Sequence, residues 1–370
     1  MRNKWRYDLD WLLVIAIRAF YLHQIGMSFN GYKFHIMNSE SSKTLDDIMV
    51  FFEQFRLPLL FIISGTGTMF AFSKRNWFQF LKERSTRLII PLIFGVLFIV
   101  PPQTYYEFIN NYSSYIDVYK SGSFETNHLW FIENLFVLSI VLIPLILFLK
   151  SSKSDRFINL LDTITSKKYG ILLCAIPLMI ITIFLKKIYP SDSNDITNLS
   201  STFYYGYFFV SGMLFTSSKN SWNHLKSHRK FNLTALVIST ILFYIYYLLP
   251  SAYISPYFSI SSRWSIWYLV CALVSWTLVT TLLGYGQIWL NKKSTLLKIC
   301  NEAIYPFYIL HQTVIIILGY YIIQFDFNIL AKIALLILTS FPLIICIYRL
   351  MIYPFKIPRI LFGMKKKENL

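Results

Sequence analysis

Charge is scarce in this sequence. Charged residues make up 14% of its 370 positions, whereas hydrophobic residues make up 55% and aromatic residues 18%. A soluble domain of ordinary composition has about 25% charged residues, so this shortage excludes a soluble fold and favours an integral membrane protein. Acidic residues are fewer than basic residues, and the net charge is +17. That charge does not indicate a nucleic-acid partner, because the basic residues lie in short segments between apolar runs.

Cysteine is rare as well, and no two cysteines have CxxC spacing. The sequence therefore predicts neither a disulfide framework nor a zinc site, and we expect no metal and no bound cofactor. A Gly/Ser linker, a long block of charge and an internal repeat are also missing, so we expect one integral membrane domain over residues 1–370. No small-residue cleavage site follows the first apolar run, which predicts an uncleaved first helix.

Long apolar runs, in contrast, are abundant. About 20 apolar residues cross a bilayer as a helix, and the runs predict an all-α polytopic protein with about ten transmembrane helices. Placing the N-terminus in the cytoplasm puts most Lys and Arg residues in inner segments, which predicts a cell-membrane protein with both termini cytoplasmic. The predicted spans are 8–27, 49–72, 86–102, 129–149, 169–189, 201–216, 231–250, 264–283, 302–324 and 329–352.

The stretch Asp8–His35 combines a spanning length with ionisable side chains. An ionisable group inside a spanning helix is costly, so each such group is a candidate functional residue. His23 lies at the outer end of the predicted first helix, and a histidine can act as a base near neutral pH. A polar anchor between helices is an equally good interpretation of His23. His35 follows in the predicted outer loop.

Two arginines follow the second predicted span. Arg84 and Arg87 are spaced i, i+3 on one helical face, and two neighbouring guanidinium groups suit phosphate recognition. Ordinary positive-inside charge explains them equally well. Within the second span, the small residues Gly65 and Gly67 predict close helix contact, with a groove for a substrate chain as the functional alternative.

Further polar side chains gather near later spans. His128 and Glu133 fall at the start of the fourth predicted span, with Glu133 about one turn inside it. Tyr308 and His311 lie in the ninth, where an unpaired polar ring is expensive. Such residues either bridge helices or line a polar cavity. We therefore name them, together with His35, as candidate substrate-binding residues.

Seven segments, in order along most of the chain, resemble the acyltransferase family 3 membrane proteins, and within them the branch similar to glucan-modifying succinyltransferases. The segments are LDWLLVIAIRAFYLH (Leu9–His23), FNGYKFHIMN (Phe29–Asn38), LPLLFIISGTG (Leu57–Gly67), ERSTRLIIPLIFG (Glu83–Gly95), PPQTYYE (Pro101–Glu107), HLWFIENLF (His128–Phe136) and YPFYILHQTVII (Tyr305–Ile316).

The resemblance implies about ten helices in a lipid bilayer and transfer of an acyl group from cytoplasmic acyl-CoA to a carbohydrate or glycan hydroxyl outside the cytoplasmic membrane. It implies that His23 is catalytic and that Arg84 and Arg87 match the family's arginines. The chain departs from the family at Leu13, where members usually have Arg or Lys. Two alternatives stay open: a transporter or flippase for a glycan or lipid-linked sugar, and a catalytically impaired family member.

Overall fold

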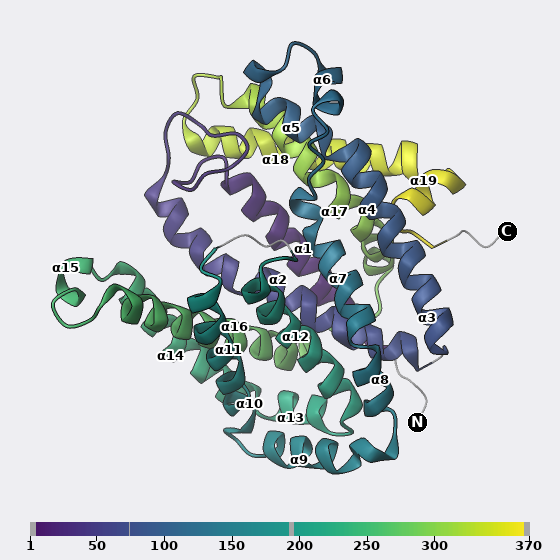
Figure 1. The fold of residues 1–370 in the computed structure, drawn as a ribbon, viewed down its shortest axis with the longest axis vertical. Helices are drawn as coiled ribbons and strands as arrows, with labels where there is room; N and C mark the ends of the chain where they lie inside the picture. The colour runs from purple at the N-terminus through teal and green to yellow at the C-terminus, as the bar shows by residue number, and fades with distance from the viewer. Residues whose placement is uncertain (1–4, 74, 192–195, 366–370) are drawn as a thin grey trace. The chain divides into compact units, whose positions relative to one another are not determined.

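The computed structural model describes residues 5–73, 75–191 and 196–365, and every regular element in those ranges is helical. The chain folds into two compact units, each described by itself. The first unit comprises the chain up to Ala16, Gln54–Trp77 and Leu138–Ser294. The second comprises Ile17–Glu53, Phe78–Val137 and the chain from Thr295 onward. Figure 1 shows the long helices α1 (Tyr7–Gly26) and α2 (Lys43–Phe72). Both helices contribute residues to both units.

Most helices of the first unit follow Leu138. They are α8 (Ile143–Leu149), α9 (Asp155–Ser166), α10 (Gly170–Leu173), α11 (Ala175–Ile188), α12 (Leu199–Ser217), α13 (Ser221–Ser227), α14 (Arg229–Leu248), α15 (Ser251–Ile254) and α16 (Ile260–Trp289). The helix α16 is central, because α11, α13 and α14 all pack along it. Its Trp276 is 1% exposed and donates its indole N–H to the Ile171 carbonyl at 2.7 Å.

Two helices of the first unit cross with their backbones in contact. A Cβ atom placed on Gly65 of α2 would lie 1.9 Å from the carbonyl oxygen of Phe209 in α12. A Cβ atom on Gly212 would lie 2.0 Å from the carbonyl oxygen of Ile62. Only glycine allows this approach, so the prediction of close helix contact is confirmed at Gly65. Gly67, in contrast, faces open space.

The second unit contains the remaining helices and three π-helical turns. The helices are α3 (Trp77–Arg84), α4 (Ile90–Phe94), α5 (Pro101–Glu107), α6 (Tyr115–Lys120), α7 (Trp130–Val141), α17 (Thr295–Ile322), α18 (Ile329–Ile347) and α19 (Lys356–Leu361). The π-helical turns are η1 (Ser85–Ile89), η2 (Gly95–Ile99) and η6 (Tyr348–Ile352). Long-range packing centres on α17, which contacts α5 and α18 (Figure 1).

The described residues contain eight helical segments long and apolar enough to cross a membrane, or nine if the bent pair Asn127–Val141 and Ile143–Leu149 is one span. The predicted all-α polytopic fold is therefore confirmed. The predicted count is about ten, and this measure of length and apolar composition gives eight or nine. The difference is the stretch predicted at 201–216, which forms the 19-residue helix α12. Its many Ser, Thr and Tyr hydroxyl groups lower its apolar character.

Two consecutive prolines, Pro101 and Pro102, break the helical hydrogen bonding between η2 and α5. Because proline has no N–H, the Leu97 carbonyl has no donor four residues later, and the N–H of Gln103, four residues after Ile99, donates to the Val100 carbonyl instead, at 2.7 Å. Side chains from elsewhere in the unit supply donors instead. The carbonyl of Leu97 accepts from the Tyr119 hydroxyl at 3.1 Å, and the carbonyl of Ile99 accepts from the Thr313 hydroxyl at 2.6 Å. This diproline step thereby ties α6 and α17 to one turn of the chain.

Candidate active site

A layer of buried amide side chains lies inside the second unit. Gln103 of α5 and Gln312 of α17 are 0% and 3% exposed. The Nε2 of Gln312 donates to Gln103 at 3.1 Å, and its Oε1 accepts from Gln24 at 3.1 Å. Gln103 also donates to Thr313 at 2.7 Å and accepts from Asn127 at 3.2 Å. Buried amides are costly unless bonded, so these mutual bonds fix the geometry of this amide layer (Gln24, Gln103, Asn127 and Gln312).

His35 joins the amide layer from the loop between α1 and α2. The Nε2 of Gln312 donates to the Nε2 of His35 at 3.0 Å, and the Nδ1 of His35 hydrogen-bonds the Glu107 carboxylate. Since Nε2 accepts from an amide, the ring hydrogen lies on Nδ1 and is donated to Glu107. His35 is therefore an imidazole oriented by a carboxylate, with its basic nitrogen turned toward the amide layer.

The loop that carries His35 is held in place by a buried lysine. Lys332 of α18 is 5% exposed, and its ammonium donates to the Asn38 side-chain oxygen at 2.7 Å and to the Ile323 carbonyl at 2.9 Å. The backbone of the same loop closes on itself, because the N–H of Asn38 donates to the Ser28 carbonyl at 2.8 Å. A buried ammonium needs such acceptors, so the loop has a fixed course.

His23 forms a second imidazole–carboxylate pair, at the end of α1. Its Nε2 lies 3.1 Å from the Oε1 of Glu53 on α2. The His23 side chain is 3% exposed, whereas the Glu53 side chain is 43% exposed. A hydrogen on Nε2 donates to the carboxylate and leaves Nδ1 as the basic atom. Because the adjacent residue Gln24 bonds Gln312, His23 lies at the level of the amide layer.

The histidines His128 and His311 bond backbone carbonyl groups instead of carboxylates. The Nε2 of His128 donates to the Ile309 carbonyl at 3.1 Å, and the Nδ1 of His311 donates to the Tyr308 carbonyl at 2.6 Å. The Tyr308 hydroxyl in turn donates to the His128 carbonyl. The two imidazole rings pack edge to face, with centroids 5.2 Å apart. These three residues cross-link η4 (Asn127–Leu129) to α17, and the Gln103 amide of the amide layer donates to the Nδ1 of His128 at 3.4 Å.

The two predicted arginines lie at another level of the second unit. The Arg87 guanidinium lies 6.0 Å from the Tyr305 ring centroid and 3.8 Å from the Glu83 carboxylate, and its Nε donates to the Gly363 carbonyl at 3.4 Å. The guanidinium of Arg84 lies 5.3 Å from the Phe80 ring. Tyr305 precedes Gln312 by two turns of α17, which is roughly 10 Å along the axis.

The structure thus brings His35, His128, Tyr308 and His311 together around the amide layer. His23 directly precedes Gln24 of that layer, and its own ring bonds Glu53. Glu133 lies in the first turn of α7, half-buried, and its part in the site stays a prediction. Sequence reasoning missed Gln103 and Glu107 as site residues. Their i, i+4 spacing at the end of an apolar run puts two polar groups on one helical face, and that pattern could have identified them.

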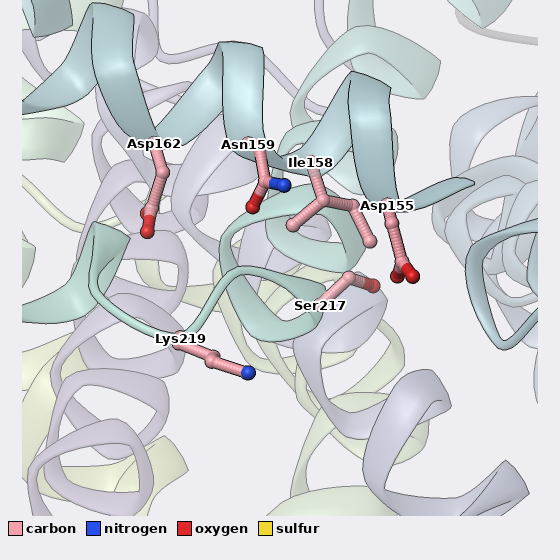
Figure 2. A pocket seen from close by; sticks show the side chains of 6 residues that line it. All are labelled: Asp155, Ile158, Asn159, Asp162, Ser217 and Lys219. Atoms are coloured by element: carbon pink, nitrogen blue, oxygen red, sulfur yellow. The ribbon is translucent and has the colours of Figure 1, made fainter. Parts of the chain in front are cut away.

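The first unit has a small polar pocket of about 240 Å³ between α9 and the end of α12. Figure 2 shows Asp155, Asn159 and Asp162 on one helix, with Ser217 and Lys219 on the facing segment. Burial raises the pKa of Asp162, but hydrogen bonds from Ser218 and Asn220 outweigh it, so that the net pKa lies below the ordinary value. The pocket includes none of the predicted site residues.

Across the described ranges, no group of three or more His, Cys, Asp or Glu side chains could hold a metal ion.

Comparison with known proteins agrees with the sequence segments and the helical fold. The family model described as an acyltransferase domain matches residues 6–349. Glucans biosynthesis protein C of Escherichia coli strain K12 is 23% identical over 343 residues, covering 85% of this chain and 83% of that protein. The same protein from strains K12 / DH10B and K12 / MC4100 / BW2952 matches equally. No solved structure matches. The chain therefore belongs to acyltransferase family 3 and is a multi-pass membrane acyltransferase.

Proposed function

We propose that this acyltransferase moves an acyl group from acyl-CoA to a hydroxyl group of a carbohydrate or glycan at the outer face of the cytoplasmic membrane. The His23–Glu53 pair carries the proposal, because an enclosed imidazole held by a carboxylate is suited to general-base catalysis. The relative's name refers to glucan biosynthesis, which supports a glucan-like acceptor.

In the proposed reaction, neutral His23 removes the proton from the acceptor hydroxyl as its oxygen attacks the thioester carbonyl carbon. The carbon–sulfur bond then breaks, and the CoA thiolate takes the proton from the imidazolium and leaves as the thiol. The acyl group ends as an ester on the glycan. The Glu53 carboxylate stabilises the imidazolium that exists between these two proton transfers.

The donor is proposed to bind through its phosphates to Arg84 and Arg87. Planar guanidinium groups bind phosphate oxygens through paired hydrogen bonds. The roughly 10 Å between Tyr305, beside Arg87, and Gln312, beside the histidines, is shorter than the extended pantetheine arm of CoA. We propose that the thioester reaches the amide layer while the phosphates stay beside the arginines.

The remaining predicted residues are proposed to bind or orient the acceptor. His35, oriented by Glu107, accepts at Nε2 from the Gln312 amide, and an acceptor hydroxyl that displaces this amide can donate to the same nitrogen. His128, Tyr308 and His311 hold the layer in place through backbone carbonyl groups. Glu133 of α7 is proposed to line a polar path between the donor and the acceptor.

We further propose that the protein is one integral domain in the cell membrane with both termini in the cytoplasm. The family match over residues 6–349 runs through both compact units, which supports a single functional domain. The distribution of Lys and Arg supports the orientation and puts the His23 end of α1 outside. The acyl donor would then bind from the cytoplasmic side and the glycan from outside.

The test uses the purified protein in lipid nanodiscs with acyl-CoA labelled in its acyl group and a glucan oligosaccharide as acceptor. We expect label on the oligosaccharide, and we expect His23→Ala to abolish transfer while membrane insertion and Tm stay unchanged. The matched control is His228→Ala, because the His228 ring lies in the first unit, where its Nε2 hydrogen-bonds the Ser166 carbonyl at 2.8 Å.

Two results would contradict the proposal. Full transfer by His23→Ala would remove the catalytic role of that residue. Oligosaccharide counterflow in proteoliposomes without any acyl transfer would favour the transporter alternative.

Activity of the unmodified chain would exclude the impaired-member alternative, despite Leu13 at the position where the family usually has Arg or Lys. Mass spectrometry of envelope glycans from cells lacking the gene would then identify the acyl group.

A further inference from the structure

Six tyrosines of the second unit form a continuous series of ring contacts. All of these contacts are edge to face, with centroids 5.2 to 5.9 Å apart. The series begins at the end of α5, runs over α6 and includes the end of α17, and α5 and α6 pack against each other (Figure 1). We call this surface the tyrosine ridge, and its members are Tyr105, Tyr106, Tyr115, Tyr119, Tyr320 and Tyr321.

The hydroxyl groups of the tyrosine ridge are ordered as well. The hydroxyls of Tyr106 and Tyr321 lie 3.0 Å apart, and those of Tyr115 and Tyr119 lie 3.2 Å apart. Tyr321 is 52% exposed and Tyr115 is 39% exposed, so both rings are accessible. The ridge thus combines aromatic surface with hydroxyl groups that can exchange their partners for those of a ligand.

The short helix α6 is fixed, which makes the ridge rigid. The backbone N–H and the hydroxyl of Ser114 both donate to the Asp117 carboxylate, at 2.9 and 3.1 Å, and Lys120 donates to it at 2.8 Å. The Tyr119 hydroxyl anchors the same helix to the Leu97 carbonyl at the diproline step. A rigid aromatic surface binds a ligand with little loss of side-chain entropy.

The ridge starts at the candidate active site. Tyr106 directly precedes Glu107, whose carboxylate orients His35. At the other helix, Tyr320 follows Gln312 by about two turns of α17, roughly 12 Å along the axis. A chain molecule bound along the ridge would therefore have one part beside the amide layer and the rest farther out.

We infer that the tyrosine ridge is the acceptor-binding surface and that it binds several consecutive sugar residues of a glycan chain. A sugar ring offers a C–H face for stacking on a tyrosine and hydroxyl groups for the phenol oxygens, whereas a lipid tail offers no hydrogen bonds. The length of the ridge, from α5 over α6, fits an oligosaccharide better than a single sugar. This inference rests on the proposed function. It adds which residues bind the acceptor and that the acceptor is a chain of several sugars.

The test compares the KM values for a glucan oligosaccharide and for glucose in lipid nanodiscs. With the unmodified protein we expect a lower KM for the oligosaccharide. With Tyr115→Ala the oligosaccharide KM should rise about tenfold, while the KM values for glucose and acyl-CoA stay unchanged. Tyr115→Phe keeps the ring and should show a smaller rise. Tyr257→Ala, at a tyrosine of the first unit that is 81% exposed, is the matched control and should change none of them.

The outcomes separate the inference from the proposed function. If the unmodified protein acylates neither acceptor, the proposed function fails and the inference with it. If it acylates both acceptors and Tyr115→Ala leaves the oligosaccharide KM unchanged, only the ridge inference is overturned. A fall in Tm in nanodiscs without a change in KM would instead identify the ridge as an aromatic belt at the lipid surface.

Discussion

Replacing Glu53 with glutamine tests whether its charge supports the imidazole of His23. Glutamine keeps the size and one acceptor oxygen, removes the charge, and replaces the second oxygen with an NH2 group. At 3.1 Å, two unit charges attract by roughly 1.3 kcal/mol in water and by roughly 5 kcal/mol at an effective dielectric constant near 20. The Glu53 side chain is 43% exposed, so solvent screening makes the lower figure the relevant one. We therefore expect kcat for acyl transfer to fall about tenfold.

The assay measures kcat in nanodiscs at saturating acyl-CoA and oligosaccharide. His23→Ala provides the lower limit, with a loss of about 10²–10⁴-fold for removal of a general base. A Tm measured on each variant shows whether the fold is intact. If Glu53→Gln retains full kcat while His23→Ala is inactive, the carboxylate has no electrostatic role in the reaction. A loss as large as that of His23→Ala would show that solvent does not screen the pair.

The other predictions concern stability. Gly65→Val should lower Tm strongly, because a carbonyl oxygen lies 1.9 Å from the added Cβ, whereas Gly67→Val should leave Tm nearly unchanged; equal Tm values would refute the backbone contact. Lys332→Met should destabilise the protein by about 1–3 kcal/mol in denaturant titrations, since two buried oxygens lose their donor. The hydrogen bond from Lys120 holds the pKa of Asp117 below its ordinary 3.8, so its stabilisation of α6 is present above that pH and is lost as pH falls through the lowered pKa. Hydrogen-exchange protection of the α6 amides should decline only in that acidic range.

Several features of the site could be predicted from the sequence because they depend on local composition. A histidine inside an apolar run needs a hydrogen-bond partner for its ring. The rings of His23, His128 and His311 are all hydrogen-bonded. The identity of each partner could not be predicted, because it depends on helix packing. His35 and Gln312, for example, are separated by 277 positions and meet only in the folded second unit.

The same limit explains the differences in the fold. The pair Gly65 and Gly67 looks symmetrical in sequence, yet only Gly65 faces a neighbouring backbone, because the two residues project to different sides of α2. The stretch 201–216 folds as a helix as expected, but its hydroxyl groups set it apart from the apolar spans. Composition predicts that a helix forms, whereas the face it buries depends on partners that are distant in the chain.

The diproline step is one short stretch of chain that is hydrogen-bonded to two parts of the second unit that are distant in the sequence. Its carbonyl groups at Leu97 and Ile99 receive hydroxyl donors from α6 and α17, and those positions are fixed by the count of residues on either side of Pro101 and Pro102. Inserting or deleting one residue between positions 95 and 103 would rotate both acceptors at once. Homologous chains should therefore keep the length of this stretch.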